Sequence, residues 1–389
     1  MGGGLMQLVA HGAQDVYLTG DPQITYFKVV YRRHTNFSME CIQQQFNTTP
    51  KPGGKTSCIV SRNGDLIGAM WLEFKLNRGA NTNLGFISYI KSVSIEIGGQ
   101  KIDTHYGRWL DIWDDLTTDA NKDEAMLTML GNTTGTGSSS TAPTDNAAII
   151  TNEMGDCFAL VPLSFWFNRN VGLALPLIAL QYHEIKLNFD FASTGSANEV
   201  WSECRLWIDY IFLDSEERKR FAQMSHEYLI DQVQSETFSL TSGASSGETK
   251  RLDINFNHPI KELVWVAEHE GARQVDITNV KLQLNGHDRF YPRCGEYFRL
   301  QQPYQFHSTV PPAEDIYVYS FALRPEEHQP SGTCNFSRID SCQMTITRSG
   351  RLIDGTSQIT ALSDSLYMYG INYNVLRIAS GMAGLAYSN

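Results

Sequence analysis

Apolar and polar residues alternate along much of this chain. The alternation is regular over residues 70–76, 185–191 and 204–212, where every second side chain is apolar. Side chains two positions apart lie on the same face of a β-strand, so each segment predicts a strand with one buried face. Further strands are predicted in the second half, over residues 263–267, 280–284, 317–323, 342–346 and 366–375. Many strands separated by Gly and Pro turns predict an all-β chain of packed sandwiches.

One short motif occurs in both halves of the chain. Residues 93–99 read Val-Ser-Ile-Glu-Ile-Gly-Gly, and residues 280–286 read Val-Lys-Leu-Gln-Leu-Asn-Gly. Each segment alternates apolar and polar residues and ends in a turn that contains glycine. The match suggests that the two halves share one plan.

The dipeptide Asn63-Gly64 is the strongest hairpin signal of the first half, because both central residues of a type I′ turn need a positive φ angle. We predict that it joins a strand over residues 58–61 to the strand over residues 70–76. The first strand of the chain is predicted over residues 27–31, directly before Arg32-Arg33-His34. These basic residues are expected to pair with carboxylates, with binding of an acid or a phosphate as the alternative.

Residues 214–224 are predicted to be a short charged helix between two β domains. Asp214 is placed to cap this helix, and Glu217 stands three residues later, at the spacing of a capping box. Glu216 precedes Arg220 by four residues, which places the two side chains together on a helix. A chain of 389 residues is long for a single sandwich. The predicted parts are an N-terminal arm over residues 1–26, a first domain over 27–213, this linker helix and a second domain over 225–389.

The apolar residues adopt a helical period between residues 108 and 130. Trp109 and Trp113 are four residues apart and are interpreted as core packing, not as a ligand site. Residues 131–146 are rich in Gly, Ser and Thr, a composition that cannot bury enough apolar surface to offset its entropy. We predict that they form a surface loop of the first domain.

Composition and charge exclude several classes of protein. Apolar residues make up 42% of the chain and charged residues 19%, which is typical of a globular protein. The formal net charge of -11 argues against direct binding of nucleic acid, because neutralising phosphates requires clustered Lys and Arg. The 7 cysteines include no Cys-x-x-Cys pair and are expected to be free thiols in a reducing compartment. We expect neither a secretory signal nor a membrane span, since the longest apolar run, residues 171–180, contains Pro176.

The sequence lacks the residue sets that common catalytic and metal sites require. His183-Glu184 and His226-Glu227 have no second histidine at the spacing of a His-Glu-x-x-His zinc site. Residues 53–56, Gly-Gly-Lys-Thr, imitate the end of a phosphate-binding loop, but Thr49 stands where its first glycine belongs. There is also no Gly-x-Ser-x-Gly nucleophile motif. We therefore predict no enzymatic activity, no cofactor and no metal site.

Two groups of residues are candidates for a function other than catalysis. Asn132 and Asn47 begin Asn-x-Ser/Thr sequences and are candidate glycosylation sites, Asn132 because it lies in the predicted Gly/Ser/Thr-rich loop. The N-terminal arm has a weak apolar pattern and is expected to be helical or irregular. The arm residues that we expect to act in assembly are Leu5, Leu8, Asp15, Tyr17 and Pro22.

Long stretches of the sequence, from one end to the other, resemble a single family. Residues 8–22 read Leu-Val-Ala-His-Gly-Ala-Gln-Asp-Val-Tyr-Leu-Thr-Gly-Asp-Pro, and residues 31–37 read Tyr-Arg-Arg-His-Thr-Asn-Phe. They resemble the major capsid proteins of nucleo-cytoplasmic large DNA viruses, in particular those of viruses that infect algae. The other stretches that carry the resemblance are residues 61–66, 172–184, 209–214, 330–340 and 372–378.

The resemblance implies a double jelly roll, in which two consecutive eight-stranded antiparallel β-sandwiches form one chain. It implies a structural protein, made late in infection, that forms pseudo-hexagonal homotrimeric capsomers of an icosahedral virion shell assembled in the host cytoplasm. The implied partners are further copies of the chain, minor capsid proteins and penton proteins. The N-terminal arm would lie beneath the trimer, near an inner membrane but not inserted in it.

One feature departs from the family, whose members often carry long insertions in the second domain. The corresponding loops, residues 241–250 and 267–276, are short in this sequence. The largest loop is instead residues 131–152, which we predict to lie on the outer surface of the capsomer.

Two other functions remain open at this stage. The first is a carbohydrate-binding jelly-roll protein without catalysis, which would expose aromatic side chains on a concave face. The second is a jelly-roll enzyme, which would gather histidines and carboxylates in a cleft.

Overall fold

The computed structural model describes residues 3–10, 12–77, 84–132, 150–151, 157–193, 199–240, 249–269, 272–273, 275–311, 316–352 and 364–387. The chain divides into two compact units, residues 1–36 and residues 37–389. We call these units the arm and the body, and each is described by itself.

The arm contains two short helices, α1 (Gly3–Val9) and α2 (Val16–Thr19), and irregular chain from there to Asn36. Residues 27–31 form no strand, so this prediction is wrong. Their apolar residues suggested a strand, but no described strand pairs with them, and Phe27 and Val30 are exposed. The first strand, β1, begins at Phe37.

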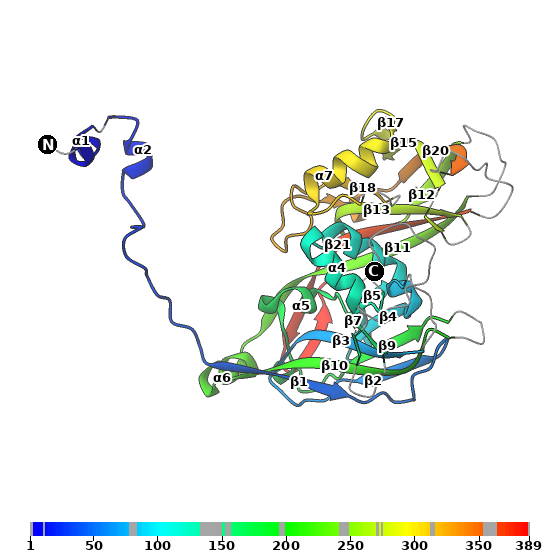
Figure 1. The fold of residues 1–389 in the computed structure, drawn as a ribbon, viewed down its shortest axis with the longest axis horizontal. Helices are drawn as coiled ribbons and strands as arrows, with labels where there is room; N and C mark the ends of the chain where they lie inside the picture. The colour runs from blue at the N-terminus through cyan, green and yellow to red at the C-terminus, as the bar shows by residue number, and fades with distance from the viewer. Residues whose placement is uncertain are drawn as a thin grey trace. The chain divides into compact units, whose positions relative to one another are not determined.

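The body begins with a sandwich of two antiparallel sheets, which we call the first lobe (Figure 1). One sheet has the strand order β1-β10-β3-β7-β6, and the other has the order β2-β9-β4-β5. Alternate side chains of β3 and β9 are buried, as the sequence predicts. The strands are β1 (Phe37–Gln44), β2 (Lys55–Ile59), β3 (Leu66–Leu76), β4 (Ile90–Ile97), β5 (Gln100–Tyr106), β6 (Ile150–Thr151), β7 (Cys157–Pro162), β8 (Leu175–Pro176), which pairs with β3, β9 (Ile185–Phe191) and β10 (Trp201–Leu213).

A second sandwich, the second lobe, follows. One sheet has the order β11-β21-β13-β14, with β18 and β19 also paired to β13 and β22 paired to β21. The other has the order β12-β20-β15-β16, with β17 paired to β15. The strands are β11 (His226–Leu240), β12 (Thr249–Ile254), β13 (Pro259–His269), β14 (Ala272–Arg273), β15 (Val275–Leu284), β16 (His287–Asp288), β17 (Arg293–Cys294), β18 (Ile316–Ser320), β19 (Cys334–Asn335), β20 (Cys342–Leu352), β21 (Asp364–Ala379) and β22 (Met382–Leu385).

The two lobes repeat one strand order. The sheet β1-β10-β3-β7 of the first lobe corresponds to β11-β21-β13-β18 of the second. The sheet β2-β9-β4-β5 corresponds in the same way to β12-β20-β15-β16. This is the order of a jelly roll, and its occurrence twice confirms the predicted double jelly roll.

The repeated sequence motif ends in equivalent hairpins. Gly98-Gly99, with φ angles of 58° and 81°, joins β4 to β5, and Asn285-Gly286, with 50° and 80°, joins β15 to β16. Both turns have the positive φ angles of a type I′ turn. By contrast, Asn63-Gly64 lies between β2 and β3, which belong to different sheets, and neither residue has a positive φ. The hairpin predicted there is wrong, because this segment carries the chain across the sandwich.

The predicted helices are present. α3 (Gly107–Thr117) and α4 (Ala120–Met129) cover most of the segment of helical period, and Trp109 and Trp113 are buried in the core. The short elements are α5 (Trp166–Arg169), α7 (Gln302–Phe306), η1 (Phe86–Ser88), η2 (Val171–Leu173), η3 (Leu177–Ala179), η4 (Tyr297–Gln301) and η5 (Phe336–Arg338).

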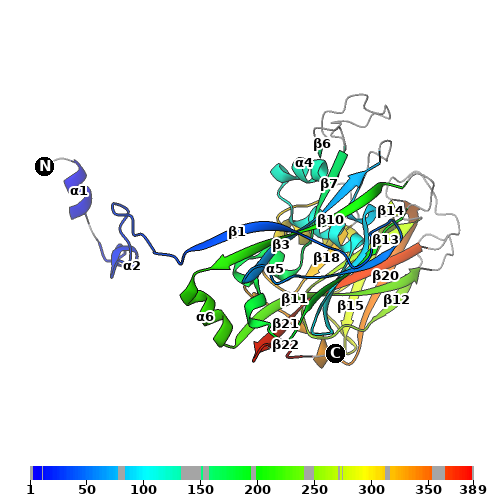
Figure 2. The same cartoon turned by 90° about the horizontal axis from the view of Figure 1, so that it is seen from below.

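The charged helix α6 (Ser215–Gln223) lies between β10 of the first lobe and β11 of the second (Figure 2). The carboxylate of Asp214 accepts a hydrogen bond from the Ser215 backbone nitrogen at 2.8 Å, which caps the helix. The Arg218 guanidinium lies 3.0 Å from the carboxylate of Asp65, so the helix is fixed to the first lobe by an ion pair.

Candidate assembly surfaces and inter-lobe pocket

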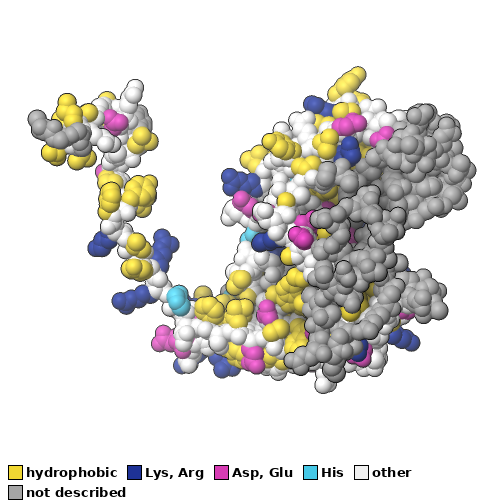
Figure 3. All heavy atoms as spheres, viewed as in Figure 1, with side chains coloured by type: hydrophobic (Ala, Val, Ile, Leu, Met, Phe, Trp, Pro, Cys, Tyr) yellow, Lys and Arg dark blue, Asp and Glu magenta, His cyan; other side chains and the backbone are white. Residues whose placement is uncertain are grey.

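The arm exposes apolar side chains along its length (Figure 3). Leu5 and Leu8, two of the predicted assembly residues, are exposed, Leu8 to 78%. Asp15 accepts a hydrogen bond from the Gly12 backbone nitrogen at 2.8 Å and directly precedes α2. Tyr17 lies in α2, and Pro22 lies in the irregular chain after it. A surface this apolar is typical of a segment that binds another surface.

The end of the arm is both aromatic and basic. Tyr26, Phe27 and Tyr31 are exposed, Phe27 to 98%. No ion pair joins Arg32 or Arg33 to a carboxylate within the part of the chain that the structure describes, and both residues are exposed. The segment therefore exposes both apolar surface and positive charge.

The two candidate glycosylation residues lie in different surroundings. Asn47 is exposed, and its side-chain nitrogen donates to Ser57 Oγ at 2.8 Å. Asn132 is only 6% exposed. Its side-chain oxygen accepts from the Leu84 backbone nitrogen at 2.5 Å, and its side-chain nitrogen donates to the Leu84 carbonyl at 2.7 Å. A glycan is attached through the side-chain nitrogen, and in both residues this nitrogen already donates a hydrogen bond. Glycosylation of Asn132 and of Asn47 stays a prediction, and the burial of Asn132 argues against a glycan there.

The predicted outer loop falls mostly outside the described residues. Only residues 131–132 and 150–151 at its two ends are described. Its place on a capsomer stays a prediction.

The hydrophobic core of the first lobe extends into the second lobe, whose interior holds a core of its own. Leu263, Trp265 and Ala267 of β13 pack into the interior of the second lobe. Val264 and Val266 point the other way and belong to the core of the first lobe. Both faces of β13 are therefore buried, which explains why its sequence is a continuous apolar run without alternation. In Figures 1 and 2, α5 lies beside β11 where the lobes meet.

Ion pairs between a partly exposed arginine and a buried carboxylate also join the lobes. Arg108 of α3 donates two hydrogen bonds to the carboxylate of Glu268 on β13, the second of them at 2.7 Å. Arg169 of α5 lies 3.0 Å from the carboxylate of Asp231 on β11. Asp231 also accepts from Lys261, whose side chain is fully buried, at 3.0 Å. Burial lowers the pKa of Lys261, and the adjacent carboxylate of Asp231 opposes that effect.

A buried histidine bridges two carboxylates in the second lobe. Nε2 of His307 lies 3.0 Å from Glu262 Oε2, and its Nδ1 lies 3.1 Å from Glu326 Oε1. The side chains of His307 and Glu262 are fully buried. Burial alone would lower the pKa of His307, but the carboxylates of Glu262 and Glu326 raise it to about 9. The imidazole is therefore charged at neutral pH and compensates the buried Glu262.

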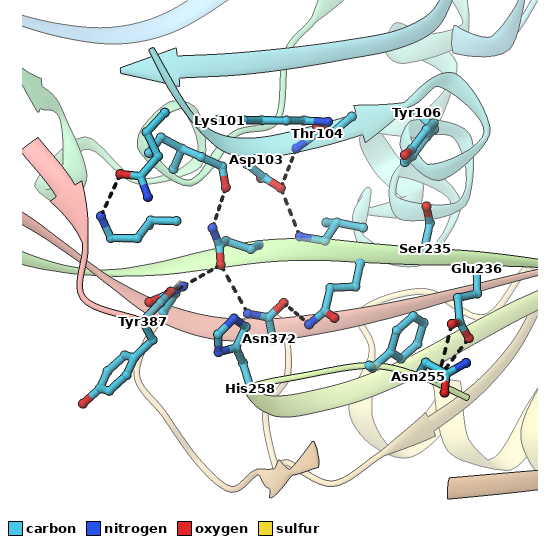
Figure 4. A pocket seen from close by; sticks show the side chains of 18 residues that line it. Lys101, Asp103, Thr104, Tyr106, Ser235, Glu236, Asn255, His258, Asn372 and Tyr387 are labelled. Atoms are coloured by element: carbon cyan, nitrogen blue, oxygen red, sulfur yellow. Dashed lines mark hydrogen bonds between the residues drawn. The ribbon is translucent and has the colours of Figure 1, made fainter. Parts of the chain in front are cut away.

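A polar pocket of about 520 Å³ lies at the junction of the lobes. Figure 4 shows Lys101 and Thr104 of β5 on one side of it and His258 and Asn255 of the second lobe on the opposite side. β11 runs between them. Several amide side chains line the pocket: Gln100, Gln232, Gln234, Asn255, Asn372 and Asn374.

Within the described residues, no group of three or more His, Cys, Asp or Glu side chains is arranged to hold a metal ion. In the same part of the chain, no helix combines the length and the apolar character that crossing a membrane requires. The 7 cysteines are free thiols, and burial raises the pKa of Cys58 to about 11 and of Cys342 to about 12.

Comparison with known proteins identifies the family. The profile of the major capsid protein N-terminus matches residues 25–214. The profile of the large eukaryotic DNA virus major capsid protein matches residues 217–277 and 268–384. The chain belongs to the major capsid proteins of large eukaryotic DNA viruses. The resemblance seen in the sequence is thereby confirmed.

Individual relatives agree with this assignment over the whole chain. The major capsid protein of Pyramimonas orientalis virus is 48% identical over the full length of both chains. The major capsid protein of Paramecium bursaria Chlorella virus 1 is 42% identical, again over the full length of both. These major capsid proteins support a structural role in a virus shell over a carbohydrate-binding role.

Solved structures of the family have the same fold. The crystal structure of VP54 of PBCV-1 matches with a TM-score of 0.82 and 38% identity, covering 94% of this chain and 100% of that one. The Faustovirus major capsid protein matches with a TM-score of 0.72 over 95% of this chain and 94% of that one. Its identity is 12%, so that match shows the fold alone.

The sequence patterns did not reveal the polar junction of this capsid protein. Lys261 and Glu262 directly precede the apolar run of β13, and Asn372 and Asn374 alternate within β21. Charged and amide residues inside a predicted strand are the signal that would have found these groups, because such residues are buried only when paired.

Proposed function

We propose that this major capsid protein forms homotrimeric capsomers that occupy pseudo-hexagonal positions in an icosahedral shell. The observation that carries the proposal is the repeat of one strand order in two lobes that are joined by a common hydrophobic cluster. Three such chains present six similar lobes, so a threefold trimer fits a site with hexagonal surroundings. A permanent interface of this kind buries on the order of 2,000 Å² or more between neighbouring chains.

The junction supports this proposal because it fixes the angle between the lobes. The packing of Val264 and Val266 into the first lobe, together with the Arg108–Glu268 pair, makes relative motion of the lobes costly. A lattice of identical units requires such a fixed angle, since each unit must present its edges in the same directions.

The arm is the part that we propose to bind neighbouring capsomers and minor capsid proteins, with penton proteins as further partners at the vertices of the shell. Its exposed apolar and basic side chains, among them Leu8, Phe27 and Arg32, support this role. We propose that the arm faces the interior of the shell, near an inner membrane but not inserted in it. The protein would act without catalysis and without contact to nucleic acid, as a virion component assembled in the host cytoplasm.

Light scattering of the purified full-length chain tests the trimer. The expected particle mass is about three times 43.7 kDa. A particle that stays at the mass of a single chain at all concentrations contradicts the proposed capsomer.

A further inference from the structure

We propose that the chains of the capsomer meet head to tail, with residues 295–306 of one chain packed against the outer face of the β1-β10-β3-β7 sheet of the next chain. At the centre of this contact, Glu296 of one chain pairs with Lys75 of its neighbour. The contact rests on the proposed trimer and specifies the two surfaces that join its chains. Both surfaces have a counterpart at the junction of the two lobes within one chain.

The junction within the chain is made by the start of α3. The first residue of this helix, Gly107, directly follows β5. The next residue, Arg108, donates two hydrogen bonds to the carboxylate of Glu268 on β13. Trp109 packs against Tyr369 of β21, with ring centroids 5.2 Å apart. A Gly-Arg-Trp sequence of the first lobe therefore contacts the outer face of the sheet β11-β21-β13-β18 of the second lobe.

The register of the strands identifies the counterpart of this sequence in the second lobe. Tyr106 pairs with Ser92, the residue before the repeated motif of the first lobe. Cys294 pairs with Asn279, the residue before the same motif in the second lobe. The three residues that follow Tyr106 and Cys294 therefore correspond, and they are Gly107-Arg108-Trp109 and Gly295-Glu296-Tyr297.

The two glycines have the same environment. A Cβ atom at Gly107 would lie 2.0 Å from the carbonyl oxygen of Ile90, and one at Gly295 would lie 1.8 Å from the carbonyl oxygen of Ile277. Ile90 and Ile277 each stand three residues before the valine of the repeated motif. Both helical segments thus begin where the backbone passes directly over the same strand position, which only glycine allows. The correspondence read from the register is confirmed by this packing.

The sheet that α3 contacts also has a counterpart. β3 and β13 each have 11 residues, and each has a β-bulge in its pairing with the next strand. β8 pairs with the first two residues of β3, as β19 pairs with the first two of β13. Lys75 of β3 and Glu268 of β13 are therefore counterparts, each the tenth residue of its strand. Trp207 and Tyr369 are counterparts because each pairs with the sixth residue.

The charges at the counterparts are reversed. Within the chain, Arg108 is the cation and Glu268 the anion of the ion pair. At the corresponding positions Glu296 is an anion and is exposed, and Lys75 is a cation and is partly exposed. Reversal at one position alone would place like charges opposite each other, whereas reversal at both keeps an attractive pair. The internal repeat therefore predicts an ion pair between Glu296 and Lys75 of the next chain.

An aromatic pair accompanies the ion pair. The counterparts of Trp109 and Tyr369 are Tyr297 and Trp207, which are also aromatic and are partly exposed. Packing of Tyr297 against Trp207 of the next chain buries both rings and adds an aromatic contact beside the ion pair.

The outer face of the first-lobe sheet is largely apolar. In the second lobe, four residues of the corresponding face are buried in the core that extends from the first lobe. These residues are Val264, Val266, Ile316 and Val318. Their counterparts in the first lobe, all partly exposed, are Trp71, Glu73, Leu160 and Pro162. The charge of Glu73 is compensated by Arg205, which lies 3.1 Å away. Burial of the three apolar residues by a neighbouring chain stabilises the contact.

The opposing surface is apolar as well. A hollow of about 580 Å³ lies beside η4, and Tyr297, Leu300, Tyr304 and Val310 are among the residues that line it. Tyr304 is 81% exposed. Figure 1 shows α7 and β10 on opposite sides of the body, so the two surfaces do not meet within one chain. Each chain supplies both surfaces, and a head-to-tail contact of this kind closes into a ring.

Charge reversal in the full-length chain tests the contact. Glu296→Lys and Lys75→Glu each place like charges opposite each other at every contact of the trimer. Each variant is expected to raise the chain concentration at which half of the chains are trimeric by about tenfold or more. The double variant restores an opposite pair and is expected to return this concentration to within about threefold of the parent value. Light scattering over a dilution series measures the concentration.

Lys186→Glu is the matched control. Lys186 is also a partly exposed lysine on a strand of the first lobe, but β9 belongs to the other sheet. This variant is expected to trimerise as the parent does. A parent chain that stays a monomer would overturn the proposed capsomer itself. A parent that trimerises, with single variants that trimerise equally well or a double variant that is not rescued, would overturn this contact alone.

Carbodiimide coupling of the parent trimer locates the pair directly. The trimer is assembled from isotopically labelled and unlabelled chains and then digested for mass spectrometry. We expect an amide between Glu296 and Lys75 in linked peptides that combine one labelled and one unlabelled chain. Linkage of Glu296 exclusively to other lysines, or exclusively within chains of one label, would contradict the proposed contact.

Discussion

His307 is the residue whose protonation is expected to change the stability of the body most directly. Its pKa is about 9 in the folded protein, above its ordinary value of 6.5. A pKa raised on folding stabilises the folded state fully below pH 6.5, and this contribution is lost as the pH rises through 9. We expect the free energy of unfolding to fall by about 3 kcal/mol over that interval. Urea titrations at a series of pH values measure this fall in the free energy of unfolding.

The control for this pH dependence is His287→Gln, because His287 is exposed on β16. His287→Gln is expected to keep the decline in stability, and His307→Gln is expected to be less stable at neutral pH and to lose most of the decline. An unchanged decline in His307→Gln would show that another group is responsible.

Asn132 is expected to be a structural residue and to carry no glycan. Asn132→Ala removes both hydrogen bonds to the backbone of Leu84 and leaves those groups buried and unpaired. The expected loss of stability is about 2 kcal/mol. Asn47→Ala, at an exposed residue in the same type of sequence, is expected to cost about 0.5 kcal/mol or less. Thermal unfolding of the two variants measures the difference, and a mass spectrum showing a glycan on Asn132 would contradict this interpretation.

At the scale of elements, the sequence predicted the strands better than the connections between them. Alternation predicted β3 and β9 because each buries one face in a sandwich. The hairpin predicted at Asn63-Gly64 was wrong, because a local turn signal does not show that the next strand lies in the other sheet. The strand predicted over residues 27–31 was wrong, because an apolar run forms a strand only when a partner strand lies beside it. The pocket residues were also unpredictable, since β5, β11 and β21 are far apart in sequence.

The arm is the element whose removal separates folding from assembly. Segment 2–25 lies in the arm, which is a compact unit distinct from the body. Deletion of residues 2–25 is therefore expected to leave a folded trimer and to impair assembly of the lattice. Light scattering measures the trimer, and electron microscopy measures the lattice.

A variant that keeps the arm but changes its surface is the control for this deletion. The double substitution Leu5→Asp and Leu8→Asp keeps the length of the chain and removes two exposed apolar side chains. It is expected to impair the lattice in the same way. A truncated chain that no longer trimerises would show that the arm acts within the capsomer instead.

At the scale of the whole molecule, the account depends on the two lobes forming one body. Arg108→Ala leaves the carboxylate of Glu268, which is 5% exposed, buried without its partner. The expected loss of stability is about 3–5 kcal/mol. Arg205 forms a more exposed pair with Glu73 inside the first lobe, so Arg205→Ala is expected to cost about 1 kcal/mol or less. Urea unfolding of both variants at one protein concentration compares them, and equal losses would mean that the junction is not held by this pair.

A density map of the assembled shell tests the central claim most directly. The duplicated lobes predict that each hexagonal position contains three chains and six jelly rolls, with two jelly rolls joined through β13 in every chain. Density showing six separate chains around a hexagonal position, or a single jelly roll in each chain, would contradict the account.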